Sequence, residues 1–376
     1  MRIGIIGAGQ LGQMLGLAAR ELGASCCFVD PSTAPPAASA GTVIRAAFDD
    51  AAALAELAGR SDVVTYEFEN VAVEALSALT GRVSVYPPPE ALRHAQDRLT
   101  EKQLFASLDI PLPAFRTVDS VDDLRRAAAS VGLPLVIKTR RMGYDGKGQA
   151  IVRSLDEAEA VVQQLGQSSL IAEQWIEFDY EVSAIGARNP GGDIVTYPLT
   201  HNEHVDGILR LSRAPVDAPE LTDRASAYLR NILEHLEYVG VLALELFVVG
   251  DQLLANEFAP RVHNSGHWTI EGTTASQFTN HLLAITNRPL LYPELRGHAG
   301  MLNLIGTIPD GTRRLQFGHL HDYGKEPRPG RKLGHITVVA ASAAERDRQL
   351  AKIDAVLNGF IGSQIPVTWP GAGKTG

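Results

Sequence analysis

A pair of apolar segments joined by a short polar turn constrains the fold of this chain more than any other feature. Residues 241–249 and 253–258 are rich in branched apolar side chains and flank Gly250-Asp251-Gln252. This pattern predicts a β-hairpin. If Val249 faces Leu253, then Glu245 faces Glu257 across the hairpin, with Cβ atoms about 4.5–5.5 Å apart.

Facing carboxylates in an apolar hairpin repel each other, so the pair needs an explanation. A magnesium ion between them would provide one, because Mg²⁺ binds one or two protein carboxylates together with phosphate oxygens. The alternative is that both glutamates are solvated on an outer face. The polar segment that follows favours the metal, since Arg261, His263 and Asn264 offer several donors for a small anion such as bicarbonate or a transferring phosphoryl group.

Composition limits the function classes. The length of 376 residues predicts two or three domains, and the net charge of −9 argues against a general nucleic-acid binder. The two cysteines are adjacent in a predicted strand and are expected in the core. The first residues do not resemble a signal peptide, and no apolar run approaches the length of a membrane span. We therefore expect a cytoplasmic enzyme that does not bind nucleic acid or membranes.

The N-terminal segment predicts an open parallel sheet. A strand at residues 2–6 runs into Gly7-x-Gly9-x-x-Gly12 and a helix, and a strand at 26–29 ends at Asp30. This matches the dinucleotide fingerprint, although such a turn also suits other phosphate-bearing ligands. Further strand and helix pairs follow to residue 86. The ligand crevice of the sheet is expected near Gln10 and Leu11, and near Glu67 at the end of a strand, unless that acid is merely solvated.

The middle of the chain predicts a glycine-rich loop between strands that could close over a ligand. One helix is expected over 90–108, followed by alternating strands and helices over 114–176. Lys138 ends an apolar strand and needs an anionic partner. The segment after it contains glycines at 143, 146 and 148 and could close over a ligand with Lys147, or it could be a hairpin tip on the surface.

The remaining segments predict two strands over 181–187 and 193–200, helices over 222–236 and 275–285, and a strand-rich C-terminal region with a helix over 344–357. His201, Asn202 and His204 are expected as a polar cluster after a strand, without the spacing of a zinc site. Residues 325–332 form a basic turn that suits a substrate phosphate or is solvated. The segment 371–375 superficially matches a phosphate loop and is interpreted as a frayed terminus.

Several motifs together resemble the N5-carboxyaminoimidazole ribonucleotide synthase family of the ATP-grasp superfamily. They lie at 97–103, 136–149, 197–210, 256–269 and 329–335, and the similarity covers essentially the whole chain. The resemblance implies an α/β (α+β) fold with a preATP-grasp domain at 1–97, an ATP-grasp domain at 98–297 with a lid at about 112–176, and a small β-rich domain at 298–376. It also implies a homodimer that uses ATP, Mg²⁺, bicarbonate and 5-aminoimidazole ribonucleotide.

The resemblance also implies roles for individual residues. The expected metal ligands are Glu245 and Glu257. The expected ATP-binding residues are Arg98, Lys138, Gly143, Tyr144, Asp145, Gly146, Lys147, Gly148, Gln149, Glu173, Gln174, Trp175, Ile176, Glu181, His204, Asn256 and Glu257. The expected ribonucleotide-binding residues are Gln10, Leu11, Glu67, Lys325, Arg331 and Lys332. Many ATP-grasp relatives carry Asn two residues after the second metal glutamate, where this chain has Ala259, so another group or water would complete the metal shell.

The expected mechanism begins with attack of bicarbonate on the γ-phosphate to form carboxyphosphate. Arg261, His263 and Asn264 are expected to hold the bicarbonate-derived group, and the amine then attacks that intermediate or CO₂ released from it. Tyr144 and Asp145 are the candidates to position the ribonucleotide and to accept a proton. The alternatives are a formate-dependent glycinamide ribonucleotide transformylase, an NAD-dependent dehydrogenase and a non-catalytic nucleotide-binding regulator.

Overall fold

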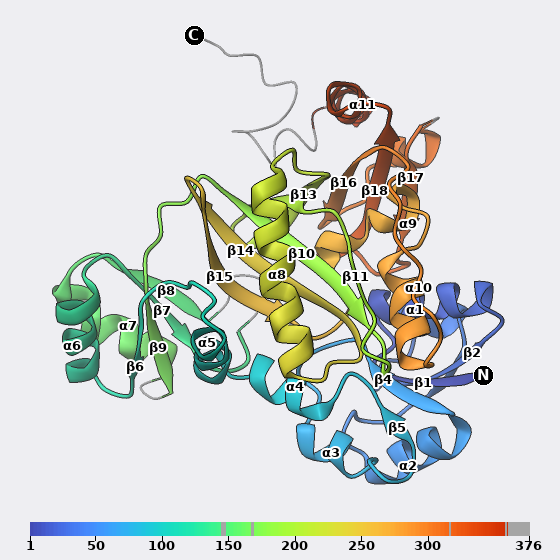
Figure 1. Ribbon diagram of the computed structural model, residues 1–376, viewed down its shortest axis with the longest axis horizontal. Coiled ribbons are helices and arrows are strands. Elements are labelled where there is room, and N and C mark those ends of the chain that lie inside the picture. Colours follow the sequence, from blue (N-terminus) through green and yellow to red (C-terminus); the bar gives the residue numbers. More distant parts are fainter. Residues whose placement is uncertain (144–147, 167–168, 316, 358, 360–376) are drawn as a thin grey trace.

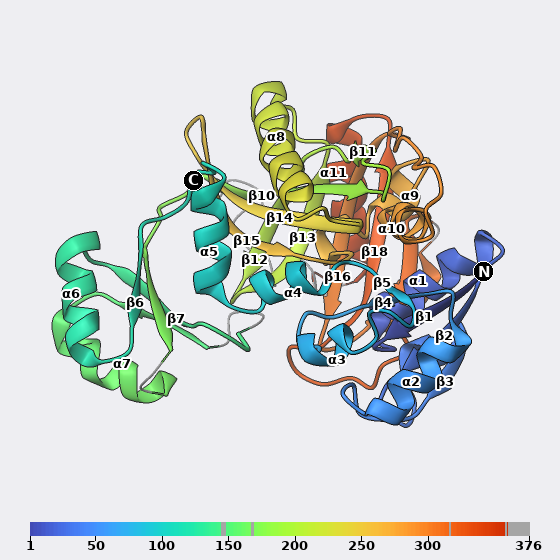
Figure 2. The same ribbon diagram turned by 60° about the horizontal axis from the view of Figure 1, so that its bottom comes forward.

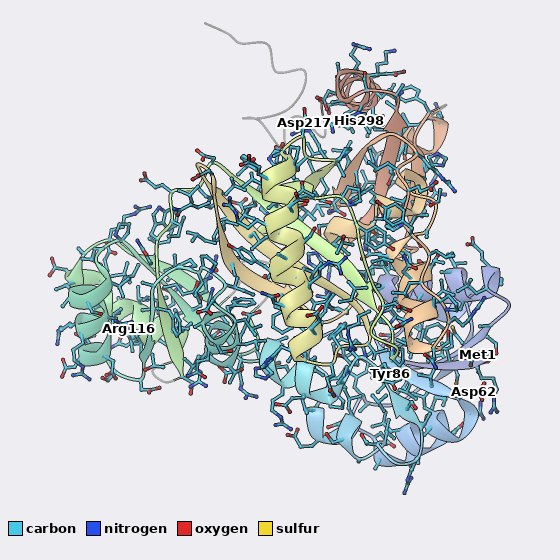
Figure 3. The ribbon with its side chains drawn as sticks, viewed as in Figure 1. Met1, Asp62, Tyr86, Arg116, Asp217 and His298 are labelled. Carbon is cyan, nitrogen blue, oxygen red and sulfur yellow. The ribbon has the colours of Figure 1, made fainter. Side chains whose placement is uncertain are left out.

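The computed structural model describes residues 1–143, 148–166, 169–315, 317–357 and 359. The chain forms three sheets, and their arrangement is visible in Figure 1 and, turned by 60°, in Figure 2. A small antiparallel sheet lies at one end, a parallel sheet at the other, and a long central sheet between them. In Figure 3, Arg116 marks the small sheet, Tyr86 follows the parallel sheet, and His298 begins a strand of the central sheet.

The N-terminal sheet is parallel and open, as predicted. Its strand order is β3-β2-β1-β4-β5, and β1 pairs in parallel with both β2 and β4. The helices α1, α2 and α3 connect the strands. The bounds are β1 (Arg2–Ile6), α1 (Gln10–Glu21), β2 (Ser25–Val29), β3 (Thr42–Ile44), α2 (Ala51–Arg60), β4 (Val63–Tyr66), α3 (Val73–Ser77) and β5 (Ser84–Val85). Strand β3 was not among the predicted elements.

The helix predicted over residues 90–108 is two helices, so that prediction was wrong. Helix α4 (Pro89–Ala95) ends before Gln96, and α5 (Arg98–Ser107) begins after Asp97. Asp97 Oδ1 accepts a hydrogen bond from the backbone N–H of Leu99 at 3.0 Å and caps α5. An aspartate at a helix start satisfies backbone donors that would otherwise lack a partner, which is why the chain breaks here.

The lid is a four-stranded antiparallel sheet of order β6-β9-β7-β8. Its elements are β6 (Phe115–Val118), α6 (Val121–Val131), β7 (Leu135–Thr139), β8 (Gln149–Val152), α7 (Ala158–Leu165) and β9 (Leu170–Gln174). Ser120 caps α6, because its side chain accepts from the N–H of Asp123. The two helices pack on the sheet around a small apolar core of their own, which makes the lid a separate unit beside the central sheet.

The central sheet has nine strands, and the C-terminal strands continue it without interruption. Its order is β15-β14-β10-β12-β13-β16-β18-β17, with β11 beside β10. The bounds are β10 (Tyr180–Arg188), β11 (Ile194–Thr196), β12 (Thr200–Val205), β13 (Ile208–Ala214), β14 (Gly240–Val249), β15 (Gln252–Ala259), β16 (His298–Ile305), β17 (His319–Asp322) and β18 (Lys332–Ala340). The predicted polar cluster of His201, Asn202 and His204 lies within β12 and not after a strand, since the motif around it forms a second hairpin with β13.

Alternation along the strands divides the apolar residues between two faces of the central sheet. On β14, Leu242 and Leu244 belong to the core beneath α8 (Pro219–His235). Val241 and Ala243 belong to the opposite core, which α10 (Gln277–Ile285) shares with α1. The N-terminal sheet is therefore fixed to the central sheet by a continuous apolar core. Helix α9 (Thr269–Gly272) precedes α10, and α11 (Ala343–Val356) packs on β16 and β18.

In the part of the chain that the structure describes, no helix is long and apolar enough to cross a membrane. The glycine-rich segment at 371–375 lies outside the described residues.

Candidate active site

A cavity of about 970 Å³ lies where the lid, the central sheet and the N-terminal sheet meet. Residues from all parts of the sequence line it, including many of those predicted for the site. The predicted residues on its wall are Gln10, Leu11, Arg98, Gly143, Glu245, Glu257, Arg261, His263, Asn264, Lys325, Arg331 and Lys332. The fold therefore brings the predicted metal, anion and phosphate groups to one place.

The two hairpin glutamates are direct cross-strand neighbours, as predicted, but they reach this position by a different register. Val249 pairs with Gln252 and not with Leu253, because the turn is shorter than predicted by one residue. An irregularity between Glu245 and Leu246 then shifts the register, and Glu245 faces Glu257. This bulge leaves Asn256 as the extra residue of β15. Because adjacent residues of a regular strand face opposite sides, a bulge is what allows Asn256 and Glu257 to share a face.

The two glutamates differ in charge environment. Burial raises the pKa of Glu245 to about 7, and the nearby Glu257 contributes to the rise. Burial also opposes ionisation of Glu257, but the charges of Arg98 and Lys138 outweigh it and lower the pKa of Glu257 to about 2. Arg98 Nη1 donates to Glu257 Oε2 at 2.9 Å.

Glu245 provides the observation that tests whether a cation fits here. Its Oε1 is buried and accepts no hydrogen bond from any described residue, and the neutral imidazole of His263 has its Nε2 3.6 Å away. A buried acceptor without a partner is costly, and a hard cation would satisfy it. The donor set of two carboxylates suits Mg²⁺ with phosphate oxygens. Among the described residues no group of three or more His, Cys, Asp or Glu side chains could hold a metal.

Lys138 has an anionic partner within the protein. It lies on β7, and its Nζ donates to Glu173 Oε2 on β9 at 2.9 Å. Lys102 Nζ lies 3.3 Å from the same oxygen and donates to the backbone carbonyl of Asn256 at 2.8 Å. Burial opposes ionisation of Glu173, but both lysines together lower its pKa to about 2. The cluster joins the lid to α5 and to the bulge of β15.

The other predicted ATP-binding residues lie on the central sheet and at the edge of the lid. His204 Nδ1 lies 2.7 Å from Glu181 Oε2, so the fold brings these two predicted residues into contact. Burial opposes protonation of His204, but Glu181 outweighs it and raises the pKa of the imidazole. Gln174 ends β9, with Trp175 and Ile176 directly after it, and Gly148 and Gln149 lie at the start of β8. Tyr144, Asp145, Gly146 and Lys147 lie outside the described residues.

The polar segment after the hairpin is held in place by hydrogen bonds. The Arg261 guanidinium pairs with the Glu69 carboxylate of the N-terminal domain. His263 Nδ1 lies 2.9 Å from Ser265 Oγ, and burial keeps the pKa of His263 well below its usual value, so the imidazole is neutral. Asn264 exchanges two hydrogen bonds with Asn303 of β16, at 2.8 and 3.0 Å. Arg261 is therefore the permanent positive charge of this segment.

Glu67 is placed differently from the expectation that it binds the ribonucleotide. Its two oxygens accept the backbone N–H groups of Gly9 at 2.5 Å and Gly12 at 2.6 Å, and the residue is only 8% exposed. Gln10 and Leu11 of the same turn line the cavity, whereas Glu67 supports the turn from beneath. The glycines are needed for this contact, since a Cβ at Gly9 would lie 2.6 Å from Glu67 Oε1.

The basic turn between β17 and β18 lines the cavity on the side that faces the glycine turn of the N-terminal sheet. Lys325 Nζ donates to Gln10 Oε1, which connects the basic turn to the glycine turn. Arg331 Nη1 donates to the backbone carbonyl of Glu326 at 3.0 Å. Lys332 begins β18 and also lines the cavity. The turn thus presents a concentration of positive charge to the N-terminal sheet.

Glu101 and Asn303 are among the polar residues at the site that sequence reasoning missed. Glu101 of α5 lines the cavity and accepts the N–H of Phe258 at 2.7 Å, and burial raises its pKa to about 8. Asn303 supports Asn264 from β16. Each had a signal in the sequence, because Glu101 lies one turn after Asp97 on a helix that enters the core, and Asn303 is the lone amide in the apolar strand MLNLIG.

Comparison with known families identifies the three parts of the chain. Residues 1–96 match the ribonucleotide synthetase preATP-grasp domain, residues 103–278 the ATP-grasp domain, and residues 299–349 the phosphoribosylaminoimidazole carboxylase C-terminal domain.

Individual proteins of this type are similar over nearly the full length. An N5-carboxyaminoimidazole ribonucleotide synthase of Pseudomonas aeruginosa is 46% identical, with 95% of this chain and 99% of that protein covered. The crystal structure of the corresponding synthetase from Thermus thermophilus is 47% identical, with a TM-score of 0.90 over 94% of this chain and 98% of that one. The synthase of Aspergillus clavatus in complex with ADP and the aminoimidazole ribonucleotide is 29% identical, with a TM-score of 0.87 over 95% and 98%.

Proposed function

The chain belongs to the N5-carboxyaminoimidazole ribonucleotide synthase family of ATP-grasp enzymes, and on that premise we propose how its own residues carry out the reaction. The activity is the ATP-dependent carboxylation of 5-aminoimidazole ribonucleotide in purine biosynthesis, performed by a ligase. We further propose bicarbonate as the carbon source, Mg²⁺ as the metal, the cytoplasm as the location and a homodimer as the assembly; the resemblance to the family is what supports these four points.

The observation that carries the assignment of the site is the buried Glu245 Oε1, which accepts no hydrogen bond from the described residues; Glu245 lies opposite Glu257 on the cavity wall. We assign these two carboxylates to Mg²⁺, which when bound would offset charge that develops on the phosphates. Arg98 pairs with Glu257, which supports assigning it to the same phosphates. Lys138 is held beside them by Glu173.

The nucleotide is assigned to the space between the lid and the central sheet. Residues 173–176 lie at the edge of the lid, and the Glu181–His204 pair lies on the central sheet. Two buried acceptors in this region, Glu173 Oε1 and Asn256 Oδ1, have no partner among the described residues. Acceptors without a partner suit the donor groups of a nucleotide. Tyr144 to Lys147 are assigned to the phosphates and the ribonucleotide by resemblance alone.

The carboxylation step is assigned to the opposite half of the cavity. Attack of bicarbonate on the γ-phosphate gives carboxyphosphate and ADP, and Arg261 is the fixed cation for the anionic group. The amine of the ribonucleotide then attacks the carboxyl carbon, phosphate leaves, and a base such as Asp145 accepts the proton. Lys325, Arg331 and Lys332 are assigned to the phosphate of the ribonucleotide, with Gln10 and Leu11 on the facing wall.

The proposed function is tested by phosphate release with ATP, bicarbonate and the ribonucleotide supplied singly and together. We expect release to rise at least about tenfold when the ribonucleotide completes the mixture, with one phosphate per carboxylated product. Glu257→Gln should lower this rate by about 10²-fold or more, since it removes one of two charges that hold the metal. Glu234→Gln on α8 lies outside the cavity lining and is the control. An ATPase rate that ignores the ribonucleotide would contradict the activity, and a normal rate in Glu257→Gln would contradict the metal assignment.

A further inference from the structure

The side chain of Asn264 on the cavity wall is held from behind by Asn303 of β16. Asn303 is 4% exposed, and its Nδ2 donates to Asn264 Oδ1 at 2.8 Å. In return, Asn264 Nδ2 donates to Asn303 Oδ1 at 3.0 Å. The two carboxamides therefore form a reciprocal pair, with one member buried in the central sheet and the other in the wall of the active site.

A backbone carbonyl fixes which way round both carboxamides lie. Asn303 Nδ2 lies 2.9 Å from the carbonyl oxygen of Leu209, which can only accept a hydrogen bond. The atom of Asn303 that faces this carbonyl must therefore be the nitrogen. The same nitrogen faces Asn264, so the Asn264 atom 2.8 Å away must be its oxygen. The remaining terminal atom of Asn264 is consequently its nitrogen.

The orientation of Asn264 commits both of its N–H donors. One donates to Asn303 Oδ1, and the other lies 3.1 Å from His267 Nδ1. His267 is 1% exposed, and burial keeps its pKa well below the usual value, so the ring is neutral and carries one proton. The same Nδ1 also lies 3.3 Å from the hydroxyl of Tyr323. The hydroxyl of Tyr323 lies 2.7 Å from His335 Nδ1 and completes the buried network.

One hydrogen-bonding capacity of Asn264 is then left for a ligand, the second lone pair of Oδ1. Carboxyphosphate does not use it, because its oxygens are acceptors at neutral pH and the O–H proton of bicarbonate has been lost when that intermediate forms. A donor is required, and the reacting donor of the proposed reaction is the exocyclic amine. This differs from the expectation that Asn264 holds the bicarbonate-derived group. Arg261 remains the donor for that group.

We propose that Asn303 is a positioning residue that turns the carbonyl oxygen of Asn264 towards the active site, where it accepts a hydrogen bond from the 5-amino group of the ribonucleotide. The contact would orient the amine and favour the aminoimidazole over a ribonucleotide without the amine. This inference rests on the proposed function and adds to it a residue that recognises the nucleophile.

The test compares two ribonucleotides in equilibrium binding to the ADP-loaded enzyme: 5-aminoimidazole ribonucleotide and the same compound without its 5-amino group. The wild type should bind the amine-bearing compound about tenfold more tightly, as expected for one net hydrogen bond. In Asn303→Ala the carboxamide of Asn264 is no longer fixed, and this ratio should fall to about twofold or less. A general loss of structure would weaken both compounds equally and leave the ratio unchanged.

Asn280→Ala is the matched control. Asn280 is also a buried carboxamide, and it donates to Leu291 O at 2.9 Å and to Tyr197 Oη at 2.8 Å, away from the cavity lining. It should lower the thermal midpoint to a similar degree and leave the ratio at about tenfold. A ratio that stays at about tenfold in Asn303→Ala would overturn the proposal.

If Asn303→Ala does not fold, the pair Asn264→Asp and Asn264→Leu decides the question. The aspartate keeps an acceptor oxygen and should retain discrimination, whereas the leucine should lose it; the proposal is wrong if both lose it equally. Failure of the proposed function gives a different result, since the wild type would then bind neither ribonucleotide. Equal binding of both compounds by a wild type that releases phosphate normally would overturn this inference alone.

Discussion

At the scale of single residues, Glu67 explains why a dinucleotide fingerprint in this chain does not need a dinucleotide. The N-terminus of α1 offers backbone N–H groups, which attract an anion in proteins with this fingerprint. Here the carboxylate of Glu67 takes those groups from Gly9 and Gly12. Asp30, the acidic residue of the fingerprint, accepts the N–H of Ala8 at 2.9 Å and of Ser32 at 2.8 Å. The backbone N–H groups of Gly9 and Gly12 are therefore already hydrogen-bonded within the chain, and the turn needs no pyrophosphate to satisfy them.

Glu67→Gln should therefore destabilise the protein although the change is nearly isosteric. One acceptor becomes an NH₂ group that faces a backbone N–H, and a buried donor without a partner costs about 1–3 kcal/mol. We expect a decrease of this size in the free energy of unfolding, measured by urea denaturation monitored by fluorescence and circular dichroism. Glu74→Gln, whose side chain is 80% exposed, is the control and should change stability by no more than about 0.5 kcal/mol. Equal stability of the two variants would contradict the role assigned to Glu67.

At the scale of elements, the hairpin shows what could be predicted and why. The apolar runs and the glycine predict two strands correctly, and the pairing of Glu245 with Glu257 is confirmed. The prediction assumed a turn one residue longer than the real one and a regular ladder. The bulge at Asn256 supplies the missing residue, so two errors cancel. Bulges depend on the contacts of the backbone with distant residues, in this case Lys102, which is why the sequence did not reveal it.

Long periodic elements and short functional segments differ in how well sequence predicts them. Strand β1 was predicted with its observed bounds and helix α8 to within three residues at each end, because their side-chain periods are clear. The break between α4 and α5 was missed. Asp97 could equally stand inside a helix, and its role as a cap depends on contacts with Arg140, 43 positions away in sequence. The partners of Glu67 were missed because Gly9 and Gly12 lie 58 and 55 positions away in sequence. The partner of Asn264 was missed because Asn303 lies 39 positions away. Propensity contains no information on such contacts.

The cap of α5 is also a joint between elements. Arg140 follows β7 of the lid, and its Nε and Nη2 donate to the two oxygens of Asp97 at 2.9 and 2.6 Å. The side chain of Asp97 is only 4% exposed and that of Arg140 24%, so solvent screens the pair weakly. Burial alone would raise the pKa of Asp97. The hydrogen bonds and the charge of Arg140 outweigh burial, so the pKa of Asp97 is lowered. The joint fixes the start of α5, and with it Arg98, relative to the lid.

A double-mutant cycle should measure this joint. Asp97→Ala and Arg140→Ala together should destabilise the protein by about 1–3 kcal/mol less than the sum of the single changes. The cycle of Asp97 with Arg141 is the comparison, since Arg141 is 60% exposed and makes a single bond of 3.2 Å to the same carboxylate. Its coupling should be below about 1 kcal/mol. Equal couplings in the two cycles would show that the bidentate geometry adds nothing.

At the scale of the whole molecule, the active site exists because distant parts of the chain share one sheet and one core. Strands β16, β17 and β18 extend the central sheet, which carries the basic turn to the cavity. The core shared by α1 and α10 brings the glycine turn to the opposite wall. Lys325 and Gln10 close the gap between the two walls, 315 positions apart in sequence. Substrate binding is therefore sensitive to the charge of Lys325, which touches both walls.

That charge should give the enzyme a pH dependence with a defined sign. Burial, and then the neighbouring Arg331, lowers the pKa of Lys325 to about 8. We expect kcat/KM for the ribonucleotide, which reports the free enzyme, to fall as pH rises above 8, by up to about tenfold per unit.

Between pH 8 and 10.5 the folded lysine binds fewer protons than the unfolded one, so this group makes the free energy of unfolding rise with pH. Titration of Lys325 therefore lowers kcat/KM without unfolding the protein. Thermal midpoints measured between pH 8 and 10.5 should show no loss of stability from this group. Lys325→Arg stays charged and should flatten the profile; a variant that follows the wild-type curve would assign the pH dependence to another group.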